Sequence, residues 1–347
     1  MKNKLKVAII GCGRIFTMHS SSIEVLKKEG LVELVAVCDI KKERADACAK
    51  EYNCKAYYSY QELFENEKLD AVHVCIPHYM HPVVSKYALS HGVNVLCEKP
   101  MAINYNDGVE CVDIAKKNNL VYSIIFQIRF NDSVKFVKQR LDDGKLGKVL
   151  SARSILTWER PDSYYGESDW KGTWDKEGGG VVIDQAIHSI DIVNWLVNSK
   201  PKTIYSSIAN RNHKIIEVED SAEGLIKYEN GTLYAFYCMN NYAVNEPIEI
   251  MLQCEKGKVI LTYENAYIYY SDGTKESIVA NADEDKKFYG EDVVDYWGFA
   301  HLKQIKNFYG AVLGTEELLI SGEEALKIQK IICSIYESGK LGKEIEL

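Results

Sequence analysis

The chain has 347 residues, of which 46% are apolar and 27% are charged. This is the composition of an ordinary globular protein that is long enough for about two domains. It contains 42 lysines and arginines and 50 aspartates and glutamates, so its net charge is −8. No block of five or six basic residues occurs. DNA and RNA are therefore excluded as expected partners.

The ten cysteines form no CxxC pair and sit mostly inside apolar runs such as VAVCDI. They are expected to be buried thiols in a reducing cytosol, so neither a metal site nor a disulfide framework is predicted. The first apolar run, Leu5 to Ile10, is too short for a signal peptide, and no stretch approaches the length of a membrane span. A cytoplasmic protein with no membrane partner is expected.

The first third of the chain alternates short apolar runs with longer amphipathic ones, which is typical of a parallel sheet with crossover helices. Strands are predicted at Val7 to Ile10, Leu34 to Cys38, Ala56 to Tyr58, Ala71 to Cys75, Val93 to Cys97 and Val121 to Phe126. Helices are predicted between them, at Lys41 to Glu51, Tyr60 to Asn66 (behind the capping box Ser59-x-x-Glu62) and Tyr105 to Asn118. The expected fold class is α/β, with a doubly wound sheet buried on both faces.

Gly11 and Gly13 follow the first strand and match the first two positions of the dinucleotide fingerprint GxGxxG, with Phe16 in the third. We expect Gly11 to make the tight turn and Gly13 to let the backbone approach a pyrophosphate. Arg14 and Ile15 then lead into the helix on whose N-terminus that pyrophosphate rests. The bulky Phe16 predicts a looser contact between strand and helix.

Asp39 closes the second strand, where a carboxylate accepts hydrogen bonds from an adenosine ribose and repels a 2′-phosphate. NAD is therefore predicted as the cofactor in preference to NADP, although Lys41 and Lys42 partly offset the repulsion. The alternative is that Asp39 caps the helix that follows.

Two further strand ends carry polar residues at the carboxyl edge, where an open parallel sheet binds its ligand. Pro77 ends one strand, and His78 and His81 either line the nicotinamide side of the cofactor or cap the next helix. Glu98 and Lys99 follow the neighbouring strand and complete the predicted cofactor site. Lys99 there would donate a hydrogen bond to a substrate oxygen, and its alternative is a solvated surface lysine.

A long connection without a helix or strand pattern runs from Glu159 to Glu177. Such connections are often lids. Aromatic side chains suit the C–H face of a sugar ring, and the alternative is that they only anchor the loop to its own core. The candidate substrate-binding aromatics are Trp158, Tyr164, Trp170 and Trp174.

Residues 178–191 read GGGVVIDQAIHSID. If the apolar run opens a helix, predicted here over Val181 to Val197, then Asp184, His188 and Asp191 lie along one face. A carboxylate that orients an imidazole and stabilises its charged form makes a general base that works near neutral pH. The alternative is a capped helix whose Asp and His are merely surface polar residues.

The second half predicts a sheet of a different kind. A helix at Asp132 to Leu141 and a strand at Lys148 to Thr157 are predicted first. After them, apolar residues recur at every second position, which is typical of strands. Asn230-Gly231 and Asp272-Gly273 are hairpin signals within this region. Its tyrosine-rich side, with Tyr228, Tyr234 and Tyr237, is either a subunit interface or a surface covered by a helix. Near the end, Tyr296 and His301 precede a helix predicted over Leu302 to Val312, where they either approach the site or cap the helix.

In combination, the GxG start, Asp39, Glu98-Lys99-Pro100 and the Asp184-x-x-x-His188 pair behind glycines resemble the Gfo/Idh/MocA family of sugar and polyol dehydrogenases. The resemblance implies an NAD(P)-binding Rossmann domain at 1–122. It also implies a substrate-binding and oligomerisation α/β domain at 123–347, with an open, mostly antiparallel sheet. Lys99, Asp184 and His188 are then catalytic, around a sugar hydroxyl, and the chain is a homodimer or homotetramer.

The resemblance also implies a role for Arg129 in FQIRFN, which matches a position where several members of the family place a substrate-contacting arginine. Its alternative is a structural salt bridge. The WKGTW segment followed by GGG resembles a branch of the family that oxidises C3 of nucleotide-linked N-acetylaminosugar acids. The expected substrate is therefore a carbohydrate or a nucleotide sugar.

The predicted function is NAD-dependent hydride transfer between a sugar, polyol or sugar-derivative hydroxyl and nicotinamide. Two alternatives stay open. One is a glycosidase or isomerising enzyme that recycles its NAD through transient oxidation of the sugar, and the other is a non-catalytic sugar or NAD sensor of the same fold.

Overall fold

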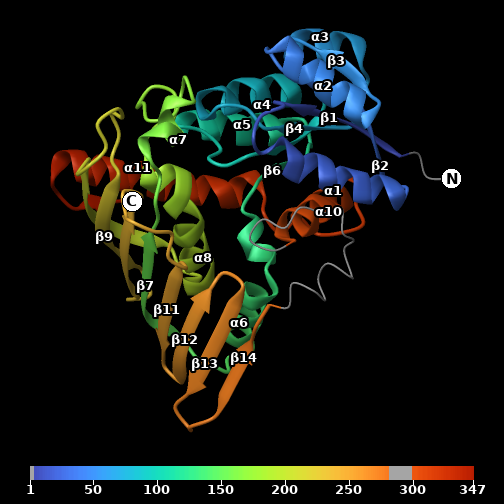
Figure 1. The fold of residues 1–347 in the computed structure, drawn as a ribbon. Coiled ribbons are helices and arrows are strands. Elements are labelled where there is room, and N and C mark those ends of the chain that lie inside the picture. Colours follow the sequence, from blue (N-terminus) through green and yellow to red (C-terminus); the bar gives the residue numbers. More distant parts are fainter. Residues whose placement is uncertain (1–3, 281–298) are drawn as a thin grey trace. The chain divides into compact units, whose positions relative to one another are not determined.

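A computed structural model describes residues 4–280 and 299–347 (Figure 1). These residues form two compact units. The described part of the first is residues 4–127 and 299–326, and that of the second is residues 128–280 and 327–347. Tyr296, noted in the sequence, lies outside the described residues.

The first unit is built on a six-stranded parallel sheet in the order β3-β2-β1-β4-β5-β6. The strands are β1 (Leu5–Ile10), β2 (Val32–Cys38), β3 (Lys55–Tyr57), β4 (Ala71–Val74), β5 (Asn94–Cys97) and β6 (Tyr122–Ile124). The helices are α1 (Phe16–Lys28), α2 (Lys42–Tyr52), α3 (Tyr60–Asn66), α4 (His81–Ser90), α5 (Tyr105–Lys117) and α10 (Ala300–Val312), with a 3-10 turn at η1 (His78–Met80). The central strands are almost entirely buried, as predicted for a doubly wound sheet covered on both faces.

Helix α10 completes the core of the first unit, although it follows the second sheet in the sequence. Its residues Ile305, Phe308 and Tyr309 are fully buried and belong to one apolar cluster with Val7 of β1 and Ile23 of α1. The compact units therefore differ from the predicted domains, which assign residues 299–326 to the second domain. Periodicity identifies α10 as an amphipathic helix but cannot say which sheet its apolar face covers.

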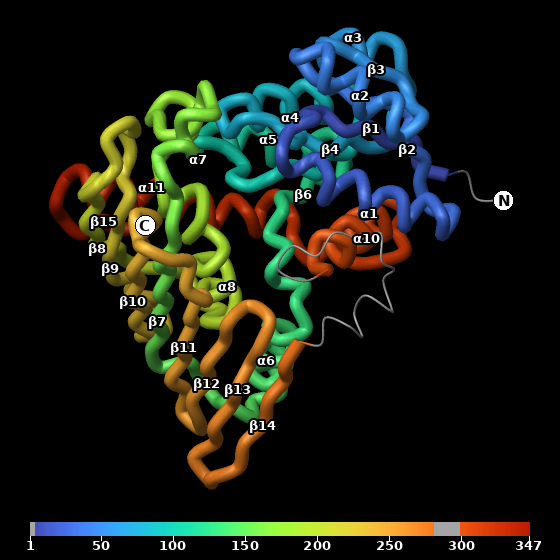
Figure 2. Tube along the Cα trace, in the orientation of Figure 1, coloured from blue at the N-terminus to red at the C-terminus, as the bar shows by residue number. Residues whose placement is uncertain are grey.

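The second unit is built on a nine-stranded mixed sheet in the order β14-β13-β12-β11-β7-β10-β9-β8-β15. Its strands are β7 (Val149–Thr157), β8 (Pro201–Ala209), β9 (Ser221–Tyr228), β10 (Leu233–Met239), β11 (Glu249–Cys254), β12 (Gly257–Thr262), β13 (Asn265–Tyr270), β14 (Lys275–Ile278) and β15 (Ile345–Glu346). Strand β10 pairs with β7 in parallel, and every other neighbour is antiparallel. Figure 2 shows β15, at the end of the chain, beside β8.

The helical segments associated with this sheet are η2 (Gln127–Phe130), α6 (Asp132–Asp142), α7 (Asp162–Gly166), a π-helical turn η3 (Val182–Ala186), α8 (Ile187–Val197) and α11 (Gly322–Leu341). Helices α6 and α8 pack against each other and against the sheet. The hairpin predicted at Asn230-Gly231 joins β9 to β10, and the one at Asp272-Gly273 joins β13 to β14. The prediction of an open, mostly antiparallel second sheet is confirmed.

The predicted tyrosine-rich side divides between the two faces of this sheet. Tyr228 and Tyr234 are 2% and 0% exposed, whereas Tyr237 is 36% exposed. Tyr237 shares its face with other exposed apolar side chains, namely Leu150, Tyr205, Leu225, Leu233, Tyr267 and Tyr269. Alternation along each strand separates the two sets. The homodimer or homotetramer expected through this sheet stays a prediction.

One local prediction is wrong and another is refined. The connection from Glu159 to Glu177 is not without structure, because Asp162 begins the short helix α7 behind Pro161. The helix predicted over Val181 to Val197 is present, with the π-helical turn η3 in its first part and an α-helix from Ile187.

All ten cysteines lie within the described residues and are free thiols. The same residues contain no group of His, Cys, Asp and Glu side chains arranged to hold a metal ion. No helix among them is both long and apolar enough to cross a membrane.

Candidate active site

The loop after β1 has the geometry that a dinucleotide requires. Gly11 has φ +105°, and a Cβ there would lie 2.1 Å from the carbonyl oxygen of Cys75, so only glycine fits. A Cβ on Gly13 would meet no atom within 4 Å, so this part of the backbone borders open space. Helix α1 begins after Ile15 with neither a side-chain cap nor an acidic residue in its first turn. Its positive end therefore suits a pyrophosphate.

Phe16, which departs from the fingerprint, is part of the core of the first unit. Its side chain is 3% exposed and packs edge-on against Tyr52 of α2, with ring centroids 5.5 Å apart. It belongs to one apolar cluster with Val7 and Ile9 of β1. The looser contact between strand and helix stays a prediction.

Asp39 lies at the end of β2 and is held by the same loop. Its Oδ2 accepts a hydrogen bond from the Cys12 N–H at 2.8 Å, and its Oδ1 accepts one from the Lys41 N–H at 2.8 Å. The residue that caps α2 is Lys41, and no side-chain cap bond forms there. Each carboxylate oxygen can accept more than one hydrogen bond, so Asp39 keeps the capacity to accept ribose hydroxyls. These residues fit NAD.

His78 and His81 are both buried, at 4% and 0% exposed. The two ring nitrogens of His81 lie 2.7 Å from the carbonyl oxygens of Pro100 and Ile76. His81 therefore ties together the backbone segments that follow β4 and β5. This arrangement supports a structural role, whereas cofactor contact by Pro77, His78 and His81 stays a prediction.

Glu98 follows β5 and is 7% exposed. Its Oε1 lies 2.9 Å from Nε2 of His19 and 3.7 Å from Nε2 of His301, and its Oε2 accepts a hydrogen bond of 3.2 Å from the Lys99 N–H. Burial alone would raise the pKa of Glu98, but the hydrogen bonds and charges of the two histidines outweigh it and hold that pKa well below the usual value. Glu98 is thus an ionised carboxylate directly beside the partly exposed Lys99.

In the second unit, the three glycines at 178–180 permit a close approach of the backbone to two buried side chains. A Cβ on Gly179 would lie 2.0 Å from the Tyr336 hydroxyl, and one on Gly180 would lie 1.9 Å from the Glu219 carbonyl oxygen. The Glu219 carboxylate accepts from the Gly180 and Val182 N–H groups at 2.9 and 3.1 Å, and the Tyr336 hydroxyl accepts from the Ile183 N–H at 3.1 Å. Residues distant in the sequence therefore satisfy the first N–H groups of this helical segment.

The π-helical turn carries Asp184, which is the centre of a polar cluster. Its Oδ2 accepts from the Tyr164 hydroxyl at 3.0 Å and from Gln185 Nε2 at 2.7 Å, and it lies 3.4 Å from Lys171 Nζ. Lys171 also bonds to the Tyr164 hydroxyl. A carboxylate held by three donors is a fixed negative charge, suited to orienting a neighbouring group and to stabilising positive charge on it.

His188 is partly buried at the start of α8. The predicted hydrogen bond between Asp184 and His188 stays a prediction, as does the basic role of His188. Asp191, expected on the same face, is 1% exposed and forms a two-pronged ion pair with Arg129, which is also 1% exposed. This is the structural salt bridge that the sequence left as the alternative for Arg129.

Two of the four predicted substrate-binding aromatics anchor their loop to the second unit. Trp158 is 7% exposed and donates to the Glu246 carbonyl oxygen at 3.1 Å. Trp174 donates to the Glu217 carbonyl oxygen at 3.0 Å and packs edge-on against Tyr336. Tyr164 instead reaches Asp184, and Trp170 lies 5.2 Å below the Lys171 ammonium. Tyr164 and Trp170 are thus the aromatics that border the polar cluster.

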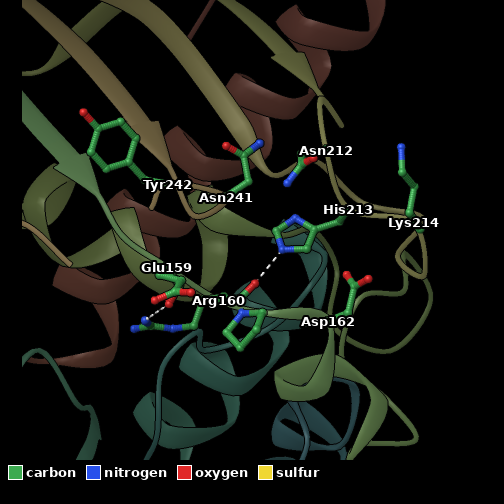
Figure 3. A pocket seen from close by; sticks show the side chains of 9 residues that line it. Glu159, Arg160, Asp162, Asn212, His213, Lys214, Asn241 and Tyr242 are labelled. Carbon is green, nitrogen blue, oxygen red and sulfur yellow. Dashed lines mark hydrogen bonds between the residues drawn. The ribbon is translucent and has the colours of Figure 1, made fainter. Parts of the chain in front are cut away.

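A pocket of about 340 Å³ opens beside this cluster, between the loops that follow β7, β8 and β10 (Figure 3). Figure 3 shows the His213 ring bonded to the Arg160 carbonyl oxygen, which lies 2.5 Å from Nε2. The Arg160 guanidinium lies 5.5 Å from the centre of the Tyr164 ring, whose hydroxyl reaches Asp184. The remaining lining residues are Glu159, Pro161, Asp162, Asn212, Lys214, Asn241 and Tyr242.

Comparison with known proteins decides the family. A profile described as an oxidoreductase family with an NAD-binding Rossmann fold matches residues 5–126, and the Gfo/Idh/MocA C-terminal domain matches residues 134–260. The chain belongs to the Gfo/Idh/MocA family. It is therefore an oxidoreductase that binds NAD, as its sequence predicts.

Individual members of the Gfo/Idh/MocA family resemble the chain over nearly its whole length. It is 27% identical to the D-glucoside 3-dehydrogenase of Escherichia coli K12, over 99% of this chain and 97% of that one. It is 23% identical to the myo-inositol 2-dehydrogenase of Thermotoga maritima, over 92% of each. The crystal structure of the WlbA dehydrogenase from Bordetella pertussis, in complex with NADH and UDP-GlcNAcA, has a TM-score of 0.86 at 25% identity. It covers 100% of this chain and 99% of that chain.

Several residues that shape the site of this Gfo/Idh/MocA member were not singled out in its sequence. Glu219 and Tyr336 hold the turn below Asp184, Gln185 bonds to Asp184, and His19 bonds to Glu98. Gln185 lies next to Asp184 in the sequence, which was a usable signal. The others come from distant segments, and no local pattern marks them.

Proposed function

We propose that the chain is an NAD-dependent dehydrogenase that oxidises a ring hydroxyl of a sugar or glycoside. The observation that carries this proposal is Asp184, fixed by Tyr164, Lys171 and Gln185 on the π-helical turn that leads into His188. A hydroxyl oxidation needs a base that receives a proton, and an imidazole next to a fixed carboxylate supplies one near neutral pH.

In the proposed reaction, the substrate hydroxyl donates to a ring nitrogen of His188, which takes its proton. Asp184 orients the imidazole and stabilises the imidazolium that results. Lys99 donates a hydrogen bond to the substrate oxygen and so lowers the pKa of the hydroxyl. NAD, which Gly11, Gly13 and Asp39 would hold, would supply the hydride acceptor for the carbinol carbon, so the products would be a ketone, NADH and one proton on His188.

The test is the variant His188→Ala. Turnover should fall about a thousandfold because the base is gone, while the NAD dissociation constant stays within twofold of the original. His91→Ala is the matched control, since His91 is exposed at the end of α4 and its ring bonds to the Tyr87 carbonyl oxygen of that helix. Turnover that survives in His188→Ala would remove the base from the proposal.

The pocket in Figure 3 favours a neutral, hydroxyl-rich substituent on the substrate, as in a glycoside, over a nucleoside diphosphate. Its two cationic side chains, Arg160 and Lys214, are balanced by Glu159 and Asp162. Balanced charge gives little attraction for a diphosphate, whereas the amides of Asn212 and Asn241 can both donate to and accept from hydroxyls.

A comparison of methyl D-glucoside, a glucose disaccharide and UDP-glucose tests this preference. We expect the lowest KM for the disaccharide. Asn212→Ala should raise the disaccharide KM several-fold and leave the methyl glucoside KM unchanged, because only the longer substrate reaches the pocket. A lower KM for UDP-glucose than for the disaccharide would favour the nucleotide-sugar alternative.

A further inference from the structure

A chain of buried hydrogen bonds in the first unit ends at Glu98, directly before Lys99. The Tyr309 hydroxyl lies 2.7 Å from Nε2 of His73, Nδ1 of His73 lies 2.7 Å from Nδ1 of His19, and Nε2 of His19 lies 2.9 Å from Glu98 Oε1. His19, His73 and Tyr309 are 0% exposed. This series of hydrogen bonds connects α10, β4 and α1 with the end of β5, and neither the proposed reaction nor the cofactor loop uses it.

The acceptors fix where the protons lie. A carboxylate only accepts hydrogen bonds, so Nε2 of His19 must carry a proton. Burial lowers the pKa of His73 well below its usual value, so this ring is neutral and has one N–H. When His19 is neutral, its Nδ1 is an acceptor, so His73 donates from Nδ1 and accepts the Tyr309 hydroxyl proton at Nε2. Every donor then points toward Glu98.

A further proton on His19 does not change the last bond of the chain. His19 would then donate from both ring nitrogens, and His73 would turn its one N–H toward the Tyr309 oxygen. In both arrangements Nε2 of His19 donates to Glu98. Glu98 thus sets the protonated nitrogen of His19, and His73 holds the His19 ring at Nδ1 in either state, which keeps Nε2 aimed at the carboxylate.

The opposite side of Glu98 holds Lys99. Oε1 is bound by His19, and Oε2 accepts from the Lys99 backbone N–H at 3.2 Å. Two oxygens bound from two directions fix the plane of the carboxylate, and one of them is bound to the Lys99 backbone. A nearby negative charge favours the protonated form of a lysine.

We propose that His19, His73 and Tyr309 are positioning residues for Lys99, acting through the oriented Glu98 carboxylate. This inference rests on the proposed function, in which Lys99 donates a hydrogen bond to the substrate oxygen. These residues fix the Glu98 carboxylate, which in turn anchors the Lys99 backbone. Second-layer partners of this kind typically change activity by about 10- to 100-fold when they are removed.

The titratable groups around Glu98 come from every element packed against it. They are His19 of α1, His73 of β4, Cys75 after β4, His81 of α4, Cys97 of β5, Lys99, and His301 and Tyr309 of α10. Burial raises the pKa of both cysteine thiols and lowers the pKa of His81 and His301, so these four groups are neutral near pH 7.

The first experiment compares His73→Phe, Tyr309→Phe and the control Tyr122→Phe. Phe can keep the stacking of His73 on Tyr309, whose ring centroids are 5.7 Å apart, while it removes the hydrogen bonds. Tyr122 is a buried tyrosine of the same unit, at 3% exposed, and lies outside the chain of hydrogen bonds.

We expect kcat with methyl D-glucoside and NAD to fall about tenfold or more in His73→Phe and about threefold in Tyr309→Phe. The NAD dissociation constant should stay within twofold. If His73→Phe matches Tyr122→Phe in kcat, the inference is overturned.

A second readout does not depend on activity. In the ¹⁵N spectrum of histidine-labelled protein, His19 should be protonated at Nε2 in the original protein, because this nitrogen donates to Glu98. A His19 ring protonated at Nδ1 alone in the original protein would contradict the proposed chain.

The variant Lys99→Met separates failure of the inference from failure of the proposed function. Normal turnover in Lys99→Met would remove Lys99 from the mechanism, whatever the His19 spectrum shows. If Lys99→Met is impaired and adding His73→Phe lowers its residual turnover no further, the hydrogen-bonded residues act through Lys99. If His73→Phe instead lowers turnover by the same factor in the original protein and in Lys99→Met, its effect is unrelated to Lys99.

Discussion

Both units bury a glutamate next to a segment that bears a predicted catalytic residue, and Glu98 and Glu219 are in opposite electrostatic situations. Glu98 in the first unit is bound by histidines, which hold its pKa well below the usual value. Glu219 in the second unit is 2% exposed, and burial raises its pKa to about 7, although N–H groups and the Tyr336 hydroxyl donate to it. Burial of a carboxylate therefore does not by itself decide its charge.

The difference follows from what each glutamate supports. Glu98 lies beside Lys99, and an ionised carboxylate there favours the cationic lysine that the proposed reaction needs. Glu219 lies below backbone N–H groups, and its task is to satisfy the start of the turn that carries Asp184. Neutral donors suffice for that task, so Glu219 can hold a proton at neutral pH without losing its function.

Among variants of the two buried glutamates Glu98 and Glu219, Glu98→Gln should produce the larger change in activity. The amide oxygen can still accept from His19, but the negative charge beside Lys99 is lost, so we expect kcat to fall about 100-fold. Glu65→Gln, at an exposed position of the same unit, is the control. Steady-state kinetics at saturating NAD provide the measurement, and a kcat within threefold of the original would show that the charge of Glu98 is dispensable.

Gly180→Ala should produce the largest loss of stability. The new Cβ would lie 1.9 Å from the Glu219 carbonyl oxygen, so the backbone must shift, at a cost of about 3 kcal/mol. Gly13→Ala is the matched comparison, since its Cβ meets no atom within 4 Å. Urea denaturation should find Gly13→Ala as stable as the original protein, with weaker NAD binding. Equal stability losses would contradict the packing argument.

Glu219→Gln should change how stability depends on pH. The folded pKa of Glu219, about 7, lies above its usual 4.5, so the folded state binds this proton more tightly than the unfolded chain does. The resulting stabilisation, up to about 3 kcal/mol, is fully present below about pH 4.5 and is lost as the pH rises through about 7.

The contribution of Glu98 to stability has the opposite pH dependence. Its folded pKa is depressed, so its contribution is present above the usual 4.5 and is lost as the pH falls through the folded value.

The measurement for Glu219 is denaturation from pH 5 to 8, followed through the tryptophans of the second unit. The free energy of unfolding should depend less on pH in Glu219→Gln than in the original protein. An unchanged slope would mean that Glu219 is ionised throughout this range.

The sequence predicted most of the fold because its signals were local. Alternating apolar runs identified the strands of both sheets, the Ser59-x-x-Glu62 box marked the start of α3, and Asn230-Gly231 marked a hairpin. The Ser59 side chain does accept from the Glu62 N–H, at 3.2 Å. Each of these features depends on residues a few positions apart, which is the distance over which a pattern is readable.

The candidate site was less predictable because distant residues shape it. An ordinary helical pattern predicted one face for Asp184, His188 and Asp191, but Glu219 and Tyr336 hold the start of that segment, and it begins as a π-helical turn. Asp191 is instead paired with Arg129, sixty-two positions away. Similarly, His19 and His73 are isolated histidines in the sequence and meet only because α1 packs against the sheet.

The central claim is that the chain oxidises a sugar hydroxyl with NAD. The most direct measurement is the absorbance of reduced nicotinamide while the purified protein, with and without added NAD, is offered inositols, free sugars, glycosides and nucleotide sugars. The account predicts one NADH formed per substrate oxidised, with glycosides as the best class. Substrate consumed without net NADH would contradict it and would point to the alternative in which the cofactor is recycled during glycoside cleavage or isomerisation.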